Sequence, residues 1–177
     1  MILVVDFGGQ YNQLIARRIR DLNIYCEVVP YNKALKELEN RNNVEGIIFT
    51  GGPNSVYEEG APQIEKEIFD KGIPVLGLCY GMQIMAHTLG GEVIKAPNER
   101  EFGKTEIETK ESLIFKNLLK EETVWMSHVD RVSQVPEGFD VIAKSKNCPI
   151  AGMANVDKKL YALQFHPEVN HSVHGKE

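Results

Sequence analysis

Short apolar runs alternate with amphipathic stretches along the first half of the chain. The apolar runs at 2–5, 46–49 and 74–78 are continuous, which is typical of strands buried on both faces. The amphipathic stretches repeat apolar side chains every three or four positions, as Ile15, Ile19 and Leu22 do, which predicts helices with one buried face. The predicted strands are 2–5, 25–29, 46–49 and 74–78, and the predicted helices are 11–22, 33–40, 62–70 and 80–89.

This alternation of strands and helices predicts an α/β fold in which a parallel sheet is covered by helices on both faces. After residue 89 the pattern changes to short β-like runs, which predict hairpins that complete a largely parallel sheet with extra antiparallel strands. These runs are 92–95, 104–109, 123–126, 140–143, 150–154 and 160–165. Ligand sites of such sheets lie at the carboxyl ends of the parallel strands, so we expect a functional site at that edge.

Length and charge narrow the class of protein. The 177 residues are enough for one domain that buries a sizeable core without disulfides or a structural metal. A net charge of -5, with the basic residues scattered, argues against binding to nucleic acid. Three scattered cysteines form no disulfide framework, and the chain shows neither a signal peptide nor an apolar run long enough to span a membrane. We therefore expect a cytoplasmic protein.

The sharpest local feature is Gly77-Leu78-Cys79-Tyr80-Gly81, at the junction between the strand 74–78 and the helix 80–89. It is the Gly-x-Cys-x-Gly form of a nucleophile elbow. The glycines are needed because the strand and the helix cross closely at this turn. The N–H groups and the dipole at the start of the helix stabilise a thiolate. We predict that Cys79 is a nucleophile, the alternative being an inert cysteine buried after a strand.

A thiolate nucleophile needs a proton carrier, and His166 is the best placed histidine. It follows the run 160–165, at a strand end where a parallel-sheet site is expected. Glu168 lies two residues further on, so in an extended segment its carboxylate projects to the same side and can hold the imidazole. His87 is disfavoured because eight residues of helix place it ~12 Å from Cys79. The residues predict a Cys-His-Glu triad of Cys79, His166 and Glu168, although His-Pro-Glu alone could be only a turn.

A glycine pair follows the strand 46–49, at Gly51 and Gly52. Adjacent glycines leave backbone amides accessible to a ligand, which suits an oxyanion hole. We predict that the hole is formed by the N–H groups of Gly52 and of Tyr80, the residue after the nucleophile. The alternatives are a glycine turn without a ligand and a phosphate-binding loop. The second is disfavoured because the chain has neither a Walker pattern nor G-x-G-x-x-G spacing.

These motifs resemble the class I glutamine amidotransferases, whose pattern is G-x-C-x-G with a distant H-P-E. The resemblance spans nearly the whole chain. It is greatest to the branch of the family that supplies ammonia for GMP formation, and it rests on the stretches 6–11, 51–57, 125–128 with Asp130, and 165–169. The resemblance implies a three-layer, flavodoxin-like fold with a nucleophile elbow. It also implies hydrolysis of L-glutamine to glutamate and ammonia through a cysteine thioester.

Carried over residue by residue, the resemblance implies the same triad and the same two oxyanion amides. It adds a set of glutamine-binding residues, which are Gly51, Gln83, Ser127, His128 and Val129. Gln83 matches the residue that contacts the amino-acid end of glutamine, and the backbone at Ser127 and His128 holds that same end. Val129 stands where many relatives have a small residue. The resemblance implies no metal and no cofactor in this domain.

The resemblance also implies a partner. Residues 1–170 match the amidotransferase domain, and residues 171–177 match the start of a linker towards an ATP-dependent synthetase domain. That synthetase, in the same or a partner chain, uses ATP and magnesium to convert XMP to GMP. Because the chain stops without a packed terminal helix, we expect a longer parent protein. We also expect the glutaminase to be a poor catalyst without its partner.

Three alternatives remain for the function. Another branch of the family, serving anthranilate, aminodeoxychorismate, CTP or imidazole glycerol phosphate synthesis, would share the triad and differ in the acceptor of ammonia. A cysteine hydrolase or peptidase would also use an elbow cysteine, but usually with a histidine outside an H-P-E pair. A non-catalytic flavodoxin-like binding module would tolerate Cys79→Ala, whereas an enzyme would lose glutamine hydrolysis with its fold intact.

Overall fold

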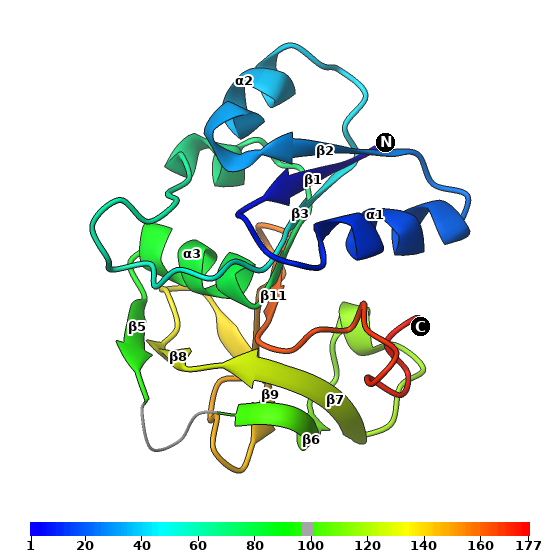
Figure 1. Ribbon diagram of the computed structural model, residues 1–177, viewed down its shortest axis with the longest axis vertical. Coiled ribbons are helices and arrows are strands. Elements are labelled where there is room, and N and C mark those ends of the chain that lie inside the picture. The colour runs from blue at the N-terminus through cyan, green and yellow to red at the C-terminus, as the bar shows by residue number, and fades with distance from the viewer. Residues whose placement is uncertain (97–100) are drawn as a thin grey trace.

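The structure, a computed structural model, describes residues 1–96 and 101–177 (Figure 1). Its strands are β1 (Ile2–Asp6), β2 (Cys26–Pro30), β3 (Gly46–Phe49), β4 (Val75–Leu78), β5 (Glu92–Lys95), β6 (Glu101–Thr109), β7 (Glu121–His128), β8 (Asp130–Gln134), β9 (Asp140–Ser145), β10 (Gly152–Asn155) and β11 (Leu160–Leu163). Its helices are α1 (Asn12–Asp21), α2 (Ala34–Glu39) and α3 (Tyr80–Thr88), with 3-10 turns at Tyr31–Lys33, Lys66–Asp70 and Leu113–Phe115. None of the helices in the two described ranges has the length and apolar character that crossing a membrane requires.

In the two described ranges, nine strands form one sheet in the order β2-β1-β3-β4-β11-β10-β9-β6-β7. The first five run parallel to their neighbours, and β10, β9, β6 and β7 continue the sheet in antiparallel pairs. The predicted α/β fold, with its largely parallel half and its antiparallel extension, is confirmed. One detail is wrong: the run 92–95 does not join this sheet, because β5 pairs with β8 in a separate two-stranded ribbon.

The central sheet is buried on both faces, which gives the fold its three layers. On β1, Leu3 and Val5 belong to one apolar cluster and Val4 to the other, because successive side chains point to opposite faces. Helix α1 covers the Val4 face with Ile15 and Ile19, while α2 and α3 cover the opposite face. Figure 1 shows α1 on one side of the parallel strands and α2 and α3 on the other.

The helix predicted over 62–70 is the clearest local error. Only a 3-10 turn, Lys66–Asp70, forms within this segment, and Glu65 before it is extended. Ile64 and Ile68 are nevertheless buried in the core, as their spacing predicts. A segment this short between a proline and Gly72 cannot offset the cost of helix nucleation, so a tighter turn is enough to bury its apolar side chains.

The hairpin region departs from the prediction at two points. Strand β6 begins at Glu101 rather than at residue 104, because Gly103 continues the strand with a positive φ of 105° that a side chain would disfavour. Strand β8 was not predicted. Its sequence is mostly polar, and only alternate residues such as Val132 are buried, so it carries a weak apolar signal.

Residues 171–173 pack against β7 and the turn after β11. The Val173 N–H donates to the Thr123 carbonyl (3.0 Å), and the Ser172 hydroxyl donates to the His166 carbonyl (2.6 Å). The ring of His171 lies against Trp125 with a centroid separation of 4.5 Å. This packing holds the turn that carries His166 in place. The assignment of residues 171–177 to a linker stays a prediction.

Candidate active site

The elbow is a sharp turn between β4 and α3. Cys79 adopts a φ of 55° and a ψ of −109°, a conformation that costs a non-glycine residue on the order of 1–3 kcal/mol. A Cβ on Gly77 would lie 2.5 Å from the Gly81 carbonyl oxygen, and a Cβ on Gly81 would lie 2.5 Å from the Phe49 carbonyl oxygen. The strands and the helix therefore approach more closely than a side chain allows, which is the reason for both glycines.

The parallel pairing of β4 with β11 brings the two ends of the predicted triad to one edge of the sheet. Leu163, the last residue of β11, pairs with Leu78, the last residue of β4. The Cys79 N–H donates to the Leu163 carbonyl (2.8 Å), so the elbow is tied directly to the neighbouring strand. His166 follows β11 by three residues and thus emerges beside Cys79.

His166 and Glu168 form a buried hydrogen-bonded pair. The His166 Nδ1–H donates to Glu168 Oε1 (2.7 Å), and both residues are about 5% exposed. The Arg18 Nε–H of helix α1 donates to the Glu168 carbonyl (3.1 Å), which fixes the turn from the other side. Glu168 Oε2 is also buried and finds no hydrogen-bond donor within the described ranges. The second oxygen is therefore not shared with another donor, and Glu168 is directed at the imidazole alone.

The protonation of His166 follows from its neighbours. Burial opposes a positive charge on the ring, but the hydrogen bonds and the charges of Cys79 and Glu168 outweigh burial and raise the pKa of His166 to about 10. The ring is accordingly protonated at neutral pH. An imidazolium beside a cysteine at a helix N-terminus is the arrangement that favours a thiolate.

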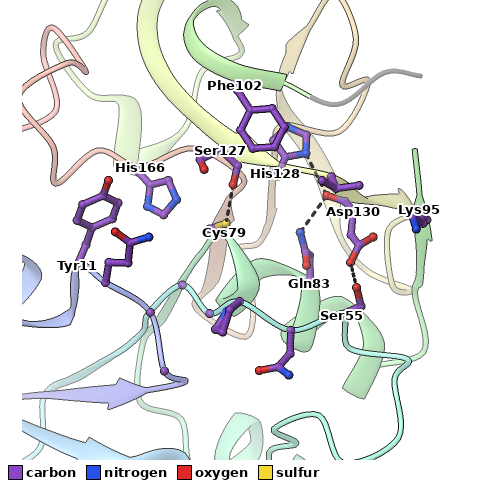
Figure 2. Close-up of a pocket in the computed structure, with 18 residues that line it drawn as sticks. Tyr11, Ser55, Cys79, Gln83, Lys95, Phe102, Ser127, His128, Asp130 and His166 are labelled. Carbon is purple, nitrogen blue, oxygen red and sulfur yellow. Dashed lines mark hydrogen bonds between the residues drawn. The ribbon is translucent and has the colours of Figure 1, made fainter. Parts of the chain in front are cut away.

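The space between Cys79 and His166 opens into the cleft, as Figure 2 shows. A Cβ on Gly51 would lie 3.3 Å from His166 Cε1 and 3.7 Å from the Cβ of Cys79, so Gly51 forms the wall behind both groups. The rings of Tyr11 and His166 pack in a T-shaped arrangement, with a centroid separation of 5.4 Å. The two reacting side chains are therefore held next to each other by the surrounding backbone and by one aromatic ring.

The Gly51–Gly52 peptide has a fixed orientation. The Thr50 hydroxyl accepts from the Phe7 N–H (3.2 Å) and donates to the Gly51 carbonyl (3.2 Å). Because a trans peptide points its carbonyl and its N–H in opposite directions, the Gly52 N–H is directed away from Thr50. Within the described ranges this N–H has no hydrogen-bond acceptor.

The Tyr80 N–H is the second amide predicted for the oxyanion hole. Tyr80 is the first residue of α3, so no carbonyl of the helix lies four residues before it to accept its N–H. The residue follows Cys79 directly and is packed near Gly52, where an added Cβ would lie 3.3 Å from its Cγ. The two predicted donors therefore lie on neighbouring segments beside the sulfur.

The opposite wall of the cleft is the turn between β7 and β8. Ser127, His128 and Val129 all line the cleft. The imidazole of His128 is buried on the far side of the turn, where its Nδ1–H donates to the Asp130 carbonyl (3.0 Å) and its Nε2 lies 3.2 Å from Glu101 Oε2. The turn can thus offer its backbone to a ligand, as the resemblance implies for Ser127 and His128.

Gln83 projects from the first turn of α3 into the same cleft. Its Nε2 donates to the Asp130 carbonyl (3.0 Å) and to Gln164 Oε1 (3.2 Å). The Asp130 carbonyl can only accept, so it determines which end of the Gln83 amide is the nitrogen. The side-chain oxygen remains available for a ligand, since no donor in the described residues reaches it.

Asp130 lines the cleft, although the sequence pattern did not place it among the glutamine-binding residues. Its carboxylate accepts hydrogen bonds from the Ser55 hydroxyl and from the Tyr57 hydroxyl (2.8 Å), and it is 7% exposed. A fixed carboxylate in a cleft suits the ammonium group of an amino acid. The available signal was its position beside Val129, within one of the stretches that carry the family resemblance.

The cleft has a volume of about 400 Å³, which lies within the range of small-molecule sites. It is lined by Gly8, Gly9, Gln10, Tyr11, Gly51, Gly52, Pro53, Asn54, Ser55, Cys79, Gln83, Lys95, Phe102, Ser127, His128, Val129, Asp130 and His166. Every predicted glutamine-binding residue is on its surface, together with the predicted nucleophile and proton carrier. Glu168 lies behind His166, as an orienting group should.

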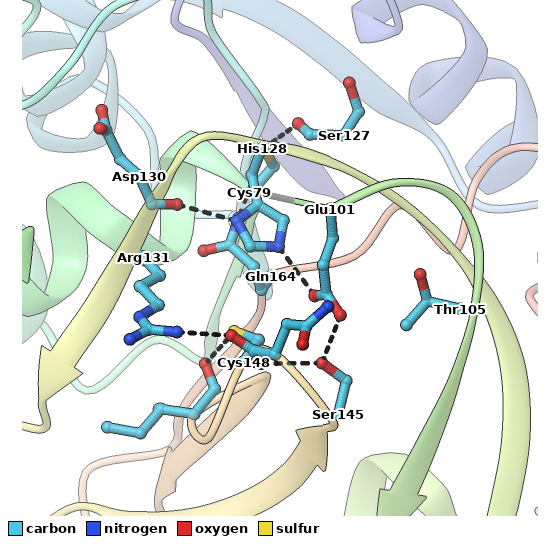
Figure 3. Close-up of polar contacts among 12 residues, drawn as sticks. Cys79, Glu101, Thr105, Ser127, His128, Asp130, Arg131, Ser145, Cys148 and Gln164 are labelled. Carbon is cyan, nitrogen blue, oxygen red and sulfur yellow. Dashed lines mark hydrogen bonds and ion pairs between the residues drawn. The ribbon is translucent and has the colours of Figure 1, made fainter. Parts of the chain in front are cut away.

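A second polar cluster lies beneath the turn between β7 and β8 (Figure 3). The ligand-type atoms of Glu101, His128 and Cys148 lie within 4.8 Å of one another. Their polar atoms are already paired: Glu101 binds His128 and the Ser145 hydroxyl (2.7 Å), and the Cys148 thiol donates to the Ile150 carbonyl (3.3 Å). We therefore interpret the cluster as a buried hydrogen-bond network that fixes the turn above it.

Comparison with known proteins decides the family. The model of a family described as glutamine amidotransferase class-I matches residues 3–177. The chain belongs to the class I glutamine amidotransferases. The Gly-x-Cys-x-Gly elbow and the His-Pro-Glu turn of this amidotransferase both lie within the matched residues.

Curated relatives of this amidotransferase carry the name GMP synthase (glutamine-hydrolysing). The protein of Finegoldia magna is 62% identical over 177 residues, and that of Clostridium botulinum strain Kyoto is 56% identical over 178 residues. These alignments cover 99% and 100% of this chain but only 34% of each relative, so the chain spans about a third of their length.

Solved structures share the fold of this amidotransferase. One is the crystal structure of a Thermoplasma acidophilum protein that is described as part of a GMP synthase; it is 36% identical, with a TM-score of 0.88. The match covers 99% of this chain and 87% of that one. A glutamine amidotransferase from Thermotoga maritima, 24% identical, has a TM-score of 0.76 and covers 95% of this chain and 76% of that one.

Proposed function

We propose that this amidotransferase is the glutaminase part of a GMP synthase. It hydrolyses L-glutamine to glutamate and ammonia, and the ammonia goes to a synthetase that converts XMP to GMP. The observation that carries the glutaminase activity is the placement of Cys79, strained at the elbow, beside a protonated His166 that Glu168 orients. The names of the relatives that match the whole chain support GMP as the product of the larger enzyme.

The cleft has groups for both ends of glutamine. The ammonium of the amino-acid end pairs with the Asp130 carboxylate and with the free oxygen of Gln83, which both line the cleft. The backbone at Ser127 and His128, which also line the cleft, holds the same end. This binding directs the side-chain amide of glutamine towards Cys79 and the glycine wall at Gly51. Binding energy at one end thus positions the reacting carbon at the other.

Acylation begins when the Cys79 thiolate attacks the amide carbon of glutamine and a C–S bond forms. The negative charge moves to the amide oxygen, which accepts from the N–H groups of Gly52 and Tyr80. His166 donates its Nε2 proton to the amide nitrogen, the C–N bond breaks, and ammonia leaves. A γ-glutamyl thioester remains on Cys79, with His166 neutral and still held by Glu168.

Deacylation uses the same groups in reverse roles. Neutral His166 accepts a proton from a water molecule while the water oxygen attacks the thioester carbon. The oxyanion again accepts from the two amides, the C–S bond breaks, and glutamate leaves. The thiolate and the imidazolium are restored, so the cycle needs no cofactor in this chain.

The partner in this proposal is a synthetase domain that uses ATP and magnesium. Residues 171–177 would lead towards it, and the relatives are long enough to contain it, because this chain covers 34% of their length. Ammonia has to reach XMP unprotonated, since ammonium is not a nucleophile. We therefore propose that the synthetase docks over the cleft and raises the glutaminase rate when its own substrates are bound.

Ammonia release from L-glutamine tests the proposal. We expect the protein to release ammonia, faster when a GMP-forming synthetase domain, ATP, magnesium and XMP are present, and we expect Cys79→Ala to abolish release with its fold retained. Cys26→Ala is the matched control, because Cys26 is also buried, donates to the Ala16 carbonyl and lies outside the cleft. Release by Cys79→Ala at the rate of the control would overturn the glutaminase assignment. An equal rate with and without the synthetase would overturn the partner.

A further inference from the structure

Gln164 is fully buried beside the elbow and has no role in the mechanism described above. It follows β11 directly, and its backbone N–H donates to the Ala151 carbonyl (2.8 Å). Its side-chain Oε1 accepts from Gln83 Nε2 (3.2 Å), and its Nε2 lies 3.7 Å from the sulfur of Cys79. A buried amide with no access to water needs a partner at each end, so these two contacts account for its position.

The orientation of the Gln164 amide follows from the chain of hydrogen bonds. The Asp130 carbonyl can only accept, so Gln83 presents its nitrogen to that carbonyl and to Gln164. Gln164 must then present its oxygen to Gln83 and its nitrogen to the sulfur. The Asp130 carbonyl on the far wall of the cleft therefore determines, through the Gln83 amide, that Gln164 directs an N–H towards Cys79.

The second polar neighbour of the Cys79 sulfur is a hydrogen-bond acceptor, whereas Gln164 is a donor. The Ser127 carbonyl lies 3.8 Å from Cys79 Sγ and accepts from the thiol. When the thiol ionises, the contact with this carbonyl becomes repulsive, whereas the contact with the Gln164 N–H strengthens because the acceptor is then charged. The Gln164 amide is thus a fixed dipole that favours the thiolate over the thiol.

We propose that Gln164 is a further catalytic residue of the glutaminase, donating an Nε2–H hydrogen bond to the Cys79 thiolate. The inference rests on the proposed function. The bond favours the thiolate before the C–S bond forms in acylation, and it favours the thiolate again as the leaving group when the C–S bond breaks in deacylation. It complements His166, which exchanges protons in the same cycle.

Steady-state kinetics of Gln164→Met give the first test. Methionine keeps the length of the side chain and removes the donor, so we expect kcat for ammonia release to fall about 10- to 100-fold, the factor for loss of one hydrogen bond to a charged group, with KM changed by less than about threefold. Gln164→Glu keeps the shape and places a carboxylate at the sulfur, and we expect a larger fall at neutral pH. Gln134→Met, an exposed glutamine on β8 outside the cleft, is the control and should retain wild-type kinetics.

Alkylation of Cys79 by iodoacetamide as a function of pH gives the second test, and it needs no glutaminase activity. Without the donor, we expect the midpoint of the alkylation profile to move upward by about one pH unit in Gln164→Met and further in Gln164→Glu. Wild-type kcat or an unmoved profile in folded Gln164→Met would overturn the inference. A wild-type protein that releases no ammonia while the alkylation profile moves as expected would refute the proposed function and leave the Gln164–Cys79 contact established.

Discussion

Replacement of Gly81 by alanine perturbs the elbow without touching any predicted catalytic side chain. The added Cβ would lie 2.5 Å from the Phe49 carbonyl oxygen and 2.7 Å from the Phe49 Cβ. Ordinary contact begins near 3.4 Å, so helix α3 and strand β3 must separate by about 0.9 Å. Overpacking of this kind costs ~1–3 kcal/mol. A shift of about 1 Å in a catalytic group lowers the rate on the order of 100-fold.

We expect Gly81→Ala to lower the thermal midpoint by roughly 2–10 °C and kcat for ammonia release about 100-fold. The assays are thermal unfolding followed by circular dichroism and glutaminase kinetics well below the midpoint. Gly60→Ala is the control: its φ is +77°, so alanine strains the backbone, but nothing lies within 4 Å of the added Cβ. It should lose stability and retain activity. Wild-type kcat in Gly81→Ala would refute the argument that the close crossing positions Cys79.

Three further predictions concern the groups around the reacting pair. The pKa of His166 is raised from 6.5 to about 10, so its protonated ring stabilises the fold fully below pH 6.5, and this stabilisation is lost as the pH rises towards 10. Glu168→Gln should lower the pKa of His166, as measured by NMR titration of the ring. An unchanged pKa would contradict the pairing of His166 with Glu168. Asp130→Asn should raise KM for glutamine about 10- to 100-fold with kcat nearly unchanged, and an unchanged KM would remove Asp130 from the binding site. Arg18→Met should lower kcat several-fold with KM retained, because the turn carrying Glu168 loses its support, and a wild-type kcat would refute this role.

The parallel half of the fold was predictable because its strands are continuous apolar runs and its first helix has one clear apolar face. Leu3 and Val5 are buried on one face of β1 and Val4 on the other, which is why this strand reads as a continuous apolar run. The antiparallel half was harder, because β8 is largely polar and Gly103 interrupts the pattern of β6. Local patterns do not encode which strand pairs with which, so the separate β5–β8 ribbon was not predictable from them.

The candidate site was predictable where a residue type is demanded by backbone geometry or by a spacing within one segment. The glycines around Cys79 indicate that the strand and the helix cross closely. The two-residue spacing of His166 and Glu168 indicates that their side chains lie on the same side of an extended segment. Gln164 was missed because its role depends on a distance across the fold to the sulfur, and a buried glutamine looks like any other polar residue at a strand end. Asp130 lies within a stretch that carries the family resemblance, but its contacts with Ser55 and Tyr57 cross the fold and leave no local pattern.

The most direct test of the central claim is the detection of the acyl-enzyme. The protein is mixed rapidly with L-glutamine, quenched in acid within one turnover, and digested for peptide mass spectrometry. We expect the peptide that contains Cys79 to gain the mass of glutamine less ammonia, and we expect no such adduct in Cys79→Ala. Ammonia release at the full rate with Cys79 unmodified throughout the turnover would contradict the account.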